Sequence, residues 1–154
     1  MRGQIISSSC GVFKILTSEG SYEGKARGTL KKKVGRLFVG DFVDFNVADS
    51  VIEDVEERKS FLIRPPISNI DQIVIILSYT KPEFSYELVF KYLTYANMNG
   101  IPASLVVTKI DLCNNQAELD EIKDTFTRLG IKTFFVCNKT GVGLDEVRGI
   151  FKDK

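Results

Sequence analysis

The chain has 154 residues, 44% of them hydrophobic, so it can bury one large core or two small ones. Its formal net charge is +1, so the chain as a whole is not expected to be attracted electrostatically to nucleic acid or to a membrane surface. The longest strongly apolar run, from Ile73 to Leu77, is far too short to span a bilayer, and no apolar secretory core follows the N-terminus. We therefore expect a cytoplasmic monomer that does not associate with membranes.

The cysteine and histidine content restricts the chemistry further. Cys10, Cys113 and Cys137 lie far apart with no C-x-x-C pair, which argues against a disulfide framework and against a zinc site. The sequence has no histidine, which excludes Ser-His and Cys-His nucleophile pairs and any histidine-ligated metal. We expect a reduced protein with no metal ligands and no catalytic residues of its own.

Residues 1–64 are predicted to form an all-β domain. Short apolar runs separated by glycine predict five strands, with no helical pattern between them. Five strands of this size predict a small barrel, and the OB fold is the commonest choice, although periodicity does not separate it from an SH3-like barrel. The predicted strands cover residues 4–8, 11–16, 21–26, 37–45 and 50–56.

Charge is divided into two blocks within this domain. Six basic residues and no acid lie between residues 25 and 36, and seven acids and no base lie between residues 41 and 57. The basic block is either a solvated hairpin loop or a rim that binds nucleic-acid phosphates, as the loops of OB barrels do. Tyr22, Phe38 and Phe42 are candidates for base stacking, although the alternation favours the core for most of them. The candidate nucleic-acid residues are Lys25, Arg27, Lys31, Lys32, Lys33 and Arg36.

The sequence changes character after Arg64, where two prolines forbid a continued helix or central strand. Residues 65–154 alternate strand and helix patterns, which predicts a parallel sheet with crossover helices, an α/β domain. Three strands make only part of a doubly wound sheet. The predicted strands are 70–78, 103–107 and 132–137, and the predicted helices are 87–98, 116–129 and 144–151.

Two short motifs directly follow the second and third of these strands. They are Thr108-Lys109-Ile110-Asp111 and Cys137-Asn138-Lys139. Ligands of open α/β sheets bind beyond the carboxyl ends of the strands, so both motifs are expected at the binding edge. Asp111 taken alone is also explained as a turn or N-cap residue, but two motifs in order, one helix apart, favour a binding site.

The residue types in these motifs suit guanine. The Asp111 carboxylate offers two acceptors to the N1–H and N2 amine of guanine, and adenine lacks that pair of donors. The stem of Lys109 would lie along one side of the base and Lys139 would cover the other. A backbone N–H near Asn138 would donate to guanine O6.

A phosphate-binding loop of the form G-x-x-x-x-G-K-[ST] does not occur in the sequence. The nearest spacing, Gly35 to Gly40, is followed by Asp41, which would repel a phosphate. Without this loop the chain has no cradle for phosphates and no hydroxyl for Mg²⁺. The residues present would hold a base but not a triphosphate, so we expect this chain to be inactive in GTP hydrolysis.

Taken together, these features resemble the RsgA-type GTPases, a circularly permuted family also called YloQ/YjeQ-like. The resemblance rests on residues 40–43, the linker 62–72, the segment 81–84, the motif 108–111 and Lys139-Thr140-Gly141. It implies an OB domain, then a GTPase domain with permuted motif order, then a zinc domain. Residue by residue, it matches Thr108, Lys109 and Asp111 to the family's first guanine motif, and Cys137, Asn138 and Lys139 to the second, where Ser-Ala-Lys is more usual.

The resemblance also implies partners and a function. The family hydrolyses GTP with Mg²⁺ in response to the small ribosomal subunit, whose late maturation it assists. The expected partners are therefore the small ribosomal subunit, its rRNA and a guanine nucleotide. The family's phosphate loop and zinc ligands have no counterpart here, so we interpret the chain as a fragment that ends before the phosphate loop. The alternative is a non-catalytic module that binds RNA or docks on the ribosome.

Overall fold

The computed structural model describes residues 1–152, apart from the side chains of residues 31 and 33. The described chain divides into two compact units, residues 1–70 and the residues from Asp71 onward. Each unit contains its own cluster of buried hydrophobic residues. Residues 64–66, where the sequence predicts a domain boundary, lie inside the first unit, in the turn between its last two strands.

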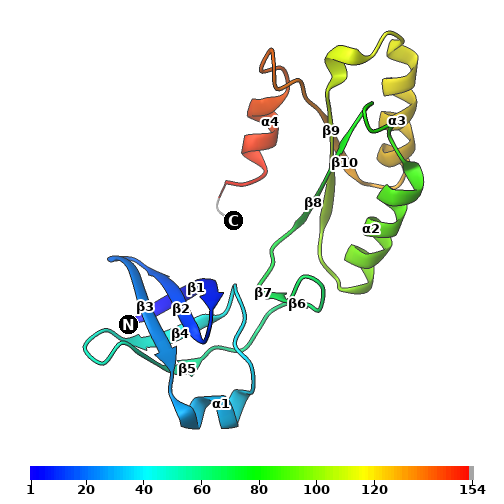
Figure 1. Ribbon diagram of the computed structural model, residues 1–154. Helices are drawn as coiled ribbons and strands as arrows, with labels where there is room; N and C mark the ends of the chain where they lie inside the picture. Colours follow the sequence, from blue (N-terminus) through cyan, green and yellow to red (C-terminus); the bar gives the residue numbers. More distant parts are fainter. Residues whose placement is uncertain (153–154) are drawn as a thin grey trace. The chain divides into compact units, whose positions relative to one another are not determined.

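The first unit is a closed five-stranded barrel with strand order β1-β2-β3-β5-β4 (Figure 1). Antiparallel pairing joins most neighbours, and β5 closes the barrel by a short parallel pairing with β3. This arrangement is OB-like and confirms the predicted fold class. The strands are β1 (Arg2–Ser9), β2 (Val12–Thr17), β3 (Gly20–Ala26), β4 (Phe42–Asn46) and β5 (Val51–Val55).

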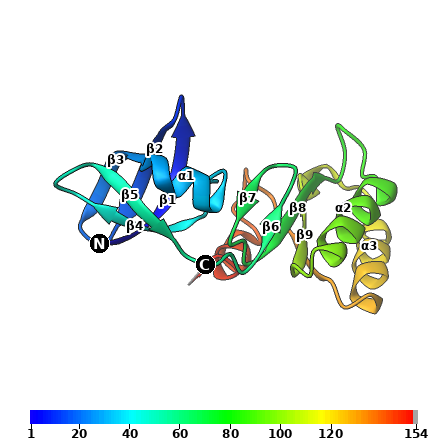
Figure 2. The same ribbon diagram turned by 90° about the horizontal axis from the view of Figure 1, so that it is seen from below.

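A short helix, α1 (Gly28–Val34), connects β3 to β4 and corrects the prediction that this region contains no helix (Figure 2). Leu30 is 3% exposed and enters the barrel core, and Val34, one turn later, packs against the same core. Seven residues with two apolar positions are too few for periodicity to predict a helix. The predicted strand 37–45 is correspondingly shorter, because β4 begins only at Phe42.

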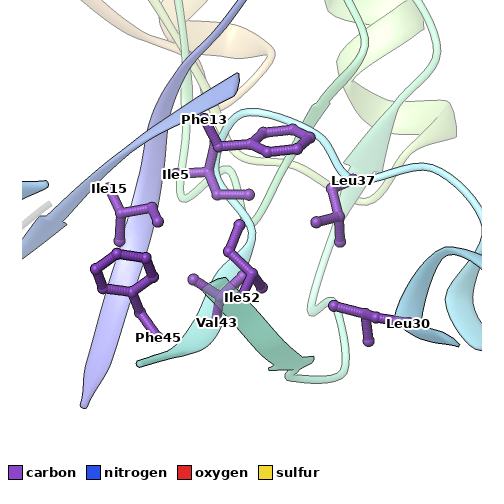
Figure 3. Close-up of a cluster of buried hydrophobic side chains, with 8 residues drawn as sticks. All are labelled: Ile5, Phe13, Ile15, Leu30, Leu37, Val43, Phe45 and Ile52. Carbon is purple, nitrogen blue, oxygen red and sulfur yellow. The ribbon is translucent and has the colours of Figure 1, made fainter. Parts of the chain in front are cut away.

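The barrel core is built from alternate residues of the strands (Figure 3). Inward-facing side chains along β1, β2, β4 and β5 are almost fully buried, while their neighbours in sequence face outward. Leu30 of α1 and Leu37 complete the cluster (Figure 3). The strand residues of this cluster are Ile5, Phe13, Ile15, Val43, Phe45 and Ile52.

A two-stranded hairpin, β6 (Phe61–Leu62) and β7 (Ile67–Ser68), follows the barrel within the same unit (Figure 2). Gly40 lies against it: a Cβ at this position would come 2.0 Å from the Ser68 carbonyl oxygen, and its φ is +95°. The side-chain amide of Asn69 donates to the Gly40 carbonyl at 2.9 Å. Only glycine permits this close approach of the hairpin to the chain that enters β4.

The carboxylate of Asp41 ties the barrel, the segment after β5 and the hairpin together. Its side chain is fully buried and accepts hydrogen bonds from the Arg58 guanidinium at 2.7 and 2.9 Å. The Ser68 hydroxyl and the Phe38 amide donate to it at 2.6 and 2.9 Å. Burial raises the pKa of Asp41, but these hydrogen bonds outweigh burial and hold its pKa below the ordinary 3.8.

The second unit is a three-stranded parallel sheet of order β10-β9-β8, as the strand and helix alternation predicts. Helices α2 and α3 cover one face of this sheet, and α4 lies on the other side (Figure 1). A cluster between the sheet and these two helices, including Ile75, Leu105 and Phe126, forms the core. No described helix is long and apolar enough to cross a membrane. The elements are β8 (Ile73–Ser78), α2 (Tyr86–Met98), β9 (Ala103–Thr108), a 3-10 helix η1 (Ile110–Leu112), α3 (Gln116–Arg128), β10 (Lys132–Phe135) and α4 (Leu144–Gly149).

We expect Asp41→Asn to lower the free energy of unfolding of the barrel by about 3 kcal/mol, because it replaces a fully buried carboxylate oxygen by an amide that cannot accept the hydrogen bonds from the partly exposed Arg58 and its other donors. A urea titration followed by the resonances of barrel residues measures this change. Asp44→Asn, on the exposed face of β4, is the matched control and should shift the midpoint little. An equal loss in both variants would contradict the role given to the buried carboxylate.

The same interaction should make the barrel sensitive to acid. Because the folded pKa of Asp41 lies below 3.8, its contribution is fully present above that pH and is lost as the pH falls through the folded pKa. The stability difference between the wild type and Asp41→Asn should therefore stay constant near neutrality and shrink below about pH 4. Urea titrations across this range measure it, and a difference that persists in acid would be inconsistent with an ionised Asp41.

Candidate functional site

The first predicted motif follows β9 at the carboxyl edge of the sheet. Lys109 adopts a left-handed backbone with φ of 59° and starts η1, which holds Asp111. The ammonium of Lys109 donates a hydrogen bond to the Lys81 carbonyl, in the segment that follows β8. Thr108 itself is the last residue of β9, and its carbonyl accepts from the Tyr79 amide at 2.8 Å.

An ion pair joins the two motifs. The Lys139 ammonium lies 2.7 Å from Asp111 Oδ2, with side-chain exposures of 74% and 23%. This hydrogen bond, supported by one from the Cys137 thiol, lowers the pKa of Asp111, and the same pair raises the pKa of Lys139. Asp111 is therefore an ionised hydrogen-bond acceptor at the edge of the sheet.

The second motif lies in a tight loop after β10. The Cys137 carbonyl accepts from the Gly141 amide at 2.8 Å, and its amide donates to the Val142 carbonyl at 3.0 Å. Gly143 closes the loop with φ of 74°, and a Cβ there would come 2.1 Å from the Phe135 carbonyl oxygen. This loop places Asn138 and Lys139 beside η1 and keeps Cys137 buried beneath them.

A hollow of about 360 Å³ opens between these loops. Four of the six residues predicted for the base site line it, whereas Thr108 and Cys137 do not. Lys81 and Leu112 also line it and were not predicted as site residues. Lys81 follows the end of β8, so the rule that parallel strands end at one edge offered a signal for it. The lining residues are Lys81, Lys109, Asp111, Leu112, Asn138 and Lys139.

The loop after β8 is fixed to the start of α3. The Tyr79 hydroxyl donates to the Glu118 carboxylate, which raises the pKa of Tyr79. The Asn115 side chain caps α3 by accepting from the Ala117 amide at 3.2 Å, at the capping position that the sequence predicts. The Tyr79 contact therefore ties the loop that carries Lys81 to the capped start of α3.

The basic block of the first unit is spread over β3, α1 and the segment that follows. Lys25 and Lys32 are exposed, and the side chains of Lys31 and Lys33 lie outside the described part of the chain. Arg27 lies 3.2 Å from Glu53 of the acidic block. Arg36 is exposed, and its guanidinium lies 5.6 Å from the centre of the Phe38 ring.

The three aromatic candidates for base stacking have different environments. Tyr22 packs against the barrel core, as the alternation favours. Phe42 faces outward, with the Arg2 guanidinium 4.3 Å from its ring centre. Phe38 is half-buried and packs against Phe61 and two arginines. The core preference therefore holds for Tyr22, while Phe38 and Phe42 lie outside the buried cluster.

Comparison with known families covers nearly the whole chain. The family model described as RsgA GTPase matches residues 55–154, and the RsgA N-terminal domain matches residues 2–51. A small ribosomal subunit biogenesis GTPase RsgA from Clostridium acetobutylicum is 38% identical over 99% of this chain and 54% of its own length. The protein of that name from Streptococcus pneumoniae is 36% identical over 84% of this chain and 46% of its own length. The chain thus spans about half the length of these curated relatives.

Two solved structures of proteins named YjeQ and YloQ are similar to this chain over nearly its whole length. The crystal structure of YjeQ from Thermotoga maritima superposes with a TM-score of 0.87 at 27% identity, covering 99% of this chain and 57% of that one. YloQ, a circularly permuted GTPase, gives a TM-score of 0.81 at 28% identity with the same coverage. With an OB-like barrel ahead of a parallel sheet and both family models matching, this chain belongs to the RsgA GTPase family.

Proposed function

We propose that this chain recognises the guanine base and binds rRNA as part of a GTPase that assists maturation of the small ribosomal subunit. The observation that carries the base site is the ionised carboxylate of Asp111, which lines a hollow at the sheet edge with Lys109 and Lys139. The names of the curated relatives support the choice of partner and of GTP as the nucleotide.

In the proposed site, Asp111 accepts from the N1–H and N2 amine of guanine. The ammonium of Lys139 already lies on one carboxylate oxygen, so the base must share or displace that contact. The stems of Lys109 and Lys139 line the hollow and can lie against the two faces of the base. Adenine offers no matching pair of donors and is rejected.

Residues of this chain are assigned to the base and to RNA, and none is assigned to phosphate or Mg²⁺ chemistry. The 154 residues contain no G-x-x-x-x-G-K-[ST] sequence. Among the described residues, no three His, Cys, Asp or Glu side chains form a group that could hold a metal ion. GTP hydrolysis and its Mg²⁺ are proposed only for the longer protein that the curated relatives represent.

Asp111→Asn should switch the base preference from guanine to xanthine. The variant presents an amide donor to the N2 amine of guanine, a mismatch of about 1–3 kcal/mol, whereas xanthine carries a carbonyl there and accepts that donor. Titrations of the ¹⁵N-labelled chain with GMP, XMP and AMP, followed by the amide signals of residues 109–112 and 138–141, measure the preference.

Asp145→Asn is the matched control for this experiment. Its side chain is 93% exposed and pairs only locally with Arg148 at 2.9 Å, so the control should keep the preference of the wild type. Retention of the GMP preference by Asp111→Asn would mean that this carboxylate is a structural turn residue. Equal weak binding of all three nucleotides by the wild type would refute the base site itself.

The basic block should bind single-stranded RNA with little sequence preference. If about three of its six residues contact phosphates, log K should fall against log salt with a slope of roughly −2. Replacing Lys31, Lys32 and Lys33 by glutamate should abolish this dependence. Fluorescence anisotropy with a labelled RNA at several salt concentrations measures the slope.

A control of equal charge separates the local effect from net charge. The control replaces three exposed residues of the second unit by glutamate, Lys91, Lys123 and Lys132. It changes the net charge of the chain by the same amount as the triple replacement in the basic block. This control should bind RNA with the slope of the wild type. If both triple variants lose the slope together, the basic block is a solvated rim and the RNA site lies elsewhere.

A further inference from the structure

Two aromatic rings and two guanidinium groups gather on the first unit, outside its core. The centres of the Phe38 and Phe61 rings are 4.8 Å apart, with their planes tilted by 51°. The Arg58 guanidinium lies 4.8 Å from the centre of Phe38 and 5.6 Å from that of Phe61. The guanidinium of Arg36 lies 5.6 Å from the centre of Phe38.

Neither ring is needed to fill the barrel. The buried cluster drawn in Figure 3 includes neither Phe38 nor Phe61, and both remain half-buried on the described surface. Phe61 belongs to hairpin β6–β7, whose tip carries Ile63 at 73% exposure. These rings are therefore apolar area that the barrel leaves partly open to solvent.

The position of Arg58 is set by hydrogen bonds in the plane of its guanidinium. Nε and Nη2 donate to the two Asp41 oxygens, and Nη2 also donates to the Arg36 carbonyl at 2.9 Å. These bonds lie at the edge of the guanidinium and hold it beside both rings. The cluster is thus a rigid set of π surfaces, held in place before any ligand arrives.

The charge beside these rings favours one kind of ligand. The exposed Arg36 ends the basic block that begins at Lys25, so the rings adjoin the stretch proposed to track phosphates. Unpaired RNA bases stack on aromatic rings and on arginine planes, and their phosphates pair with nearby cations. The alternative ligand, an apolar surface of another protein, would pack on the rings but would leave the exposed cation beside them without a partner.

We propose that Phe38, Phe61, Arg36 and Arg58 form a stacking platform for one unpaired base of a single-stranded RNA. Phe61 and Phe38 supply the π surface, Arg58 fixes their spacing, and Arg36 contacts the adjoining phosphate. This site rests on the proposed RNA-binding function and extends it from phosphate contact to base contact.

Phe61→Leu tests the platform because leucine keeps an apolar side chain and removes the π face. Binding of an oligoadenylate of about 12 nucleotides should weaken about tenfold, with an unchanged salt slope. Phe90→Leu, at a phenylalanine of α2 that is 42% exposed, is the matched control and should bind as the wild type does. Thermal unfolding of each variant checks that the barrel is intact.

A second measurement uses the wild type and so does not depend on the folding of a variant. An abasic strand of the same length should bind the wild type about tenfold more weakly than the oligoadenylate, and Phe61→Leu should bind it as the wild type does. Equal binding of both strands by the wild type, or a tenfold loss on both strands in Phe61→Leu, would overturn the platform while leaving RNA binding in place. A wild type that binds neither strand would refute the proposed RNA function, and the platform with it.

Discussion

The buried carboxylate of Asp41 is the interaction on which the first unit depends. A charge without access to water is tolerable only when every oxygen is hydrogen-bonded, and here four donor contacts from Arg58, Ser68 and Phe38 meet that demand. The donors come from the chain before β4, the segment after β5 and the hairpin, so one carboxylate fixes three pieces, of which the first and the last also meet in a single bridge between Val39 and Ile67. Positions of Phe38 and Arg58 on the surface are set by the same contacts.

The second unit depends on a different constraint, the parallel direction of its strands. Because β8, β9 and β10 end at one edge, three loops separated in sequence meet there, and each contributes a lysine to the same hollow. Lys81, Lys109 and Lys139 line this hollow together with one carboxylate, Asp111, which pairs with Lys139. The topology brings these residues together, while the local turns decide which atoms face the hollow.

Helices and strands long enough to repeat their hydrophobic pattern could be predicted from the sequence, and contacts between residues distant in the chain could not. The helices and strands of the second unit and the two motif loops follow from periodicity and from the edge rule. Helix α1 was missed because seven residues show too little periodicity, and hairpin β6–β7 because two-residue strands leave no alternation. The pairing of Asp41 with Arg58 has no local signature, and Lys81 entered the site only through the direction of its strand.

The loops at the sheet edge are tied to one another before any ligand is present. Lys109 holds the loop after β9 to the carbonyl of Lys81, and the pair of Lys139 with Asp111 joins the loop after β10 to η1. Ordering a loop costs conformational entropy, and this cost is normally met when the ligand binds. In this chain, much of that entropy cost is already met when the protein folds. A base that binds in the cleft would therefore exchange one contact for another without having to order the loops.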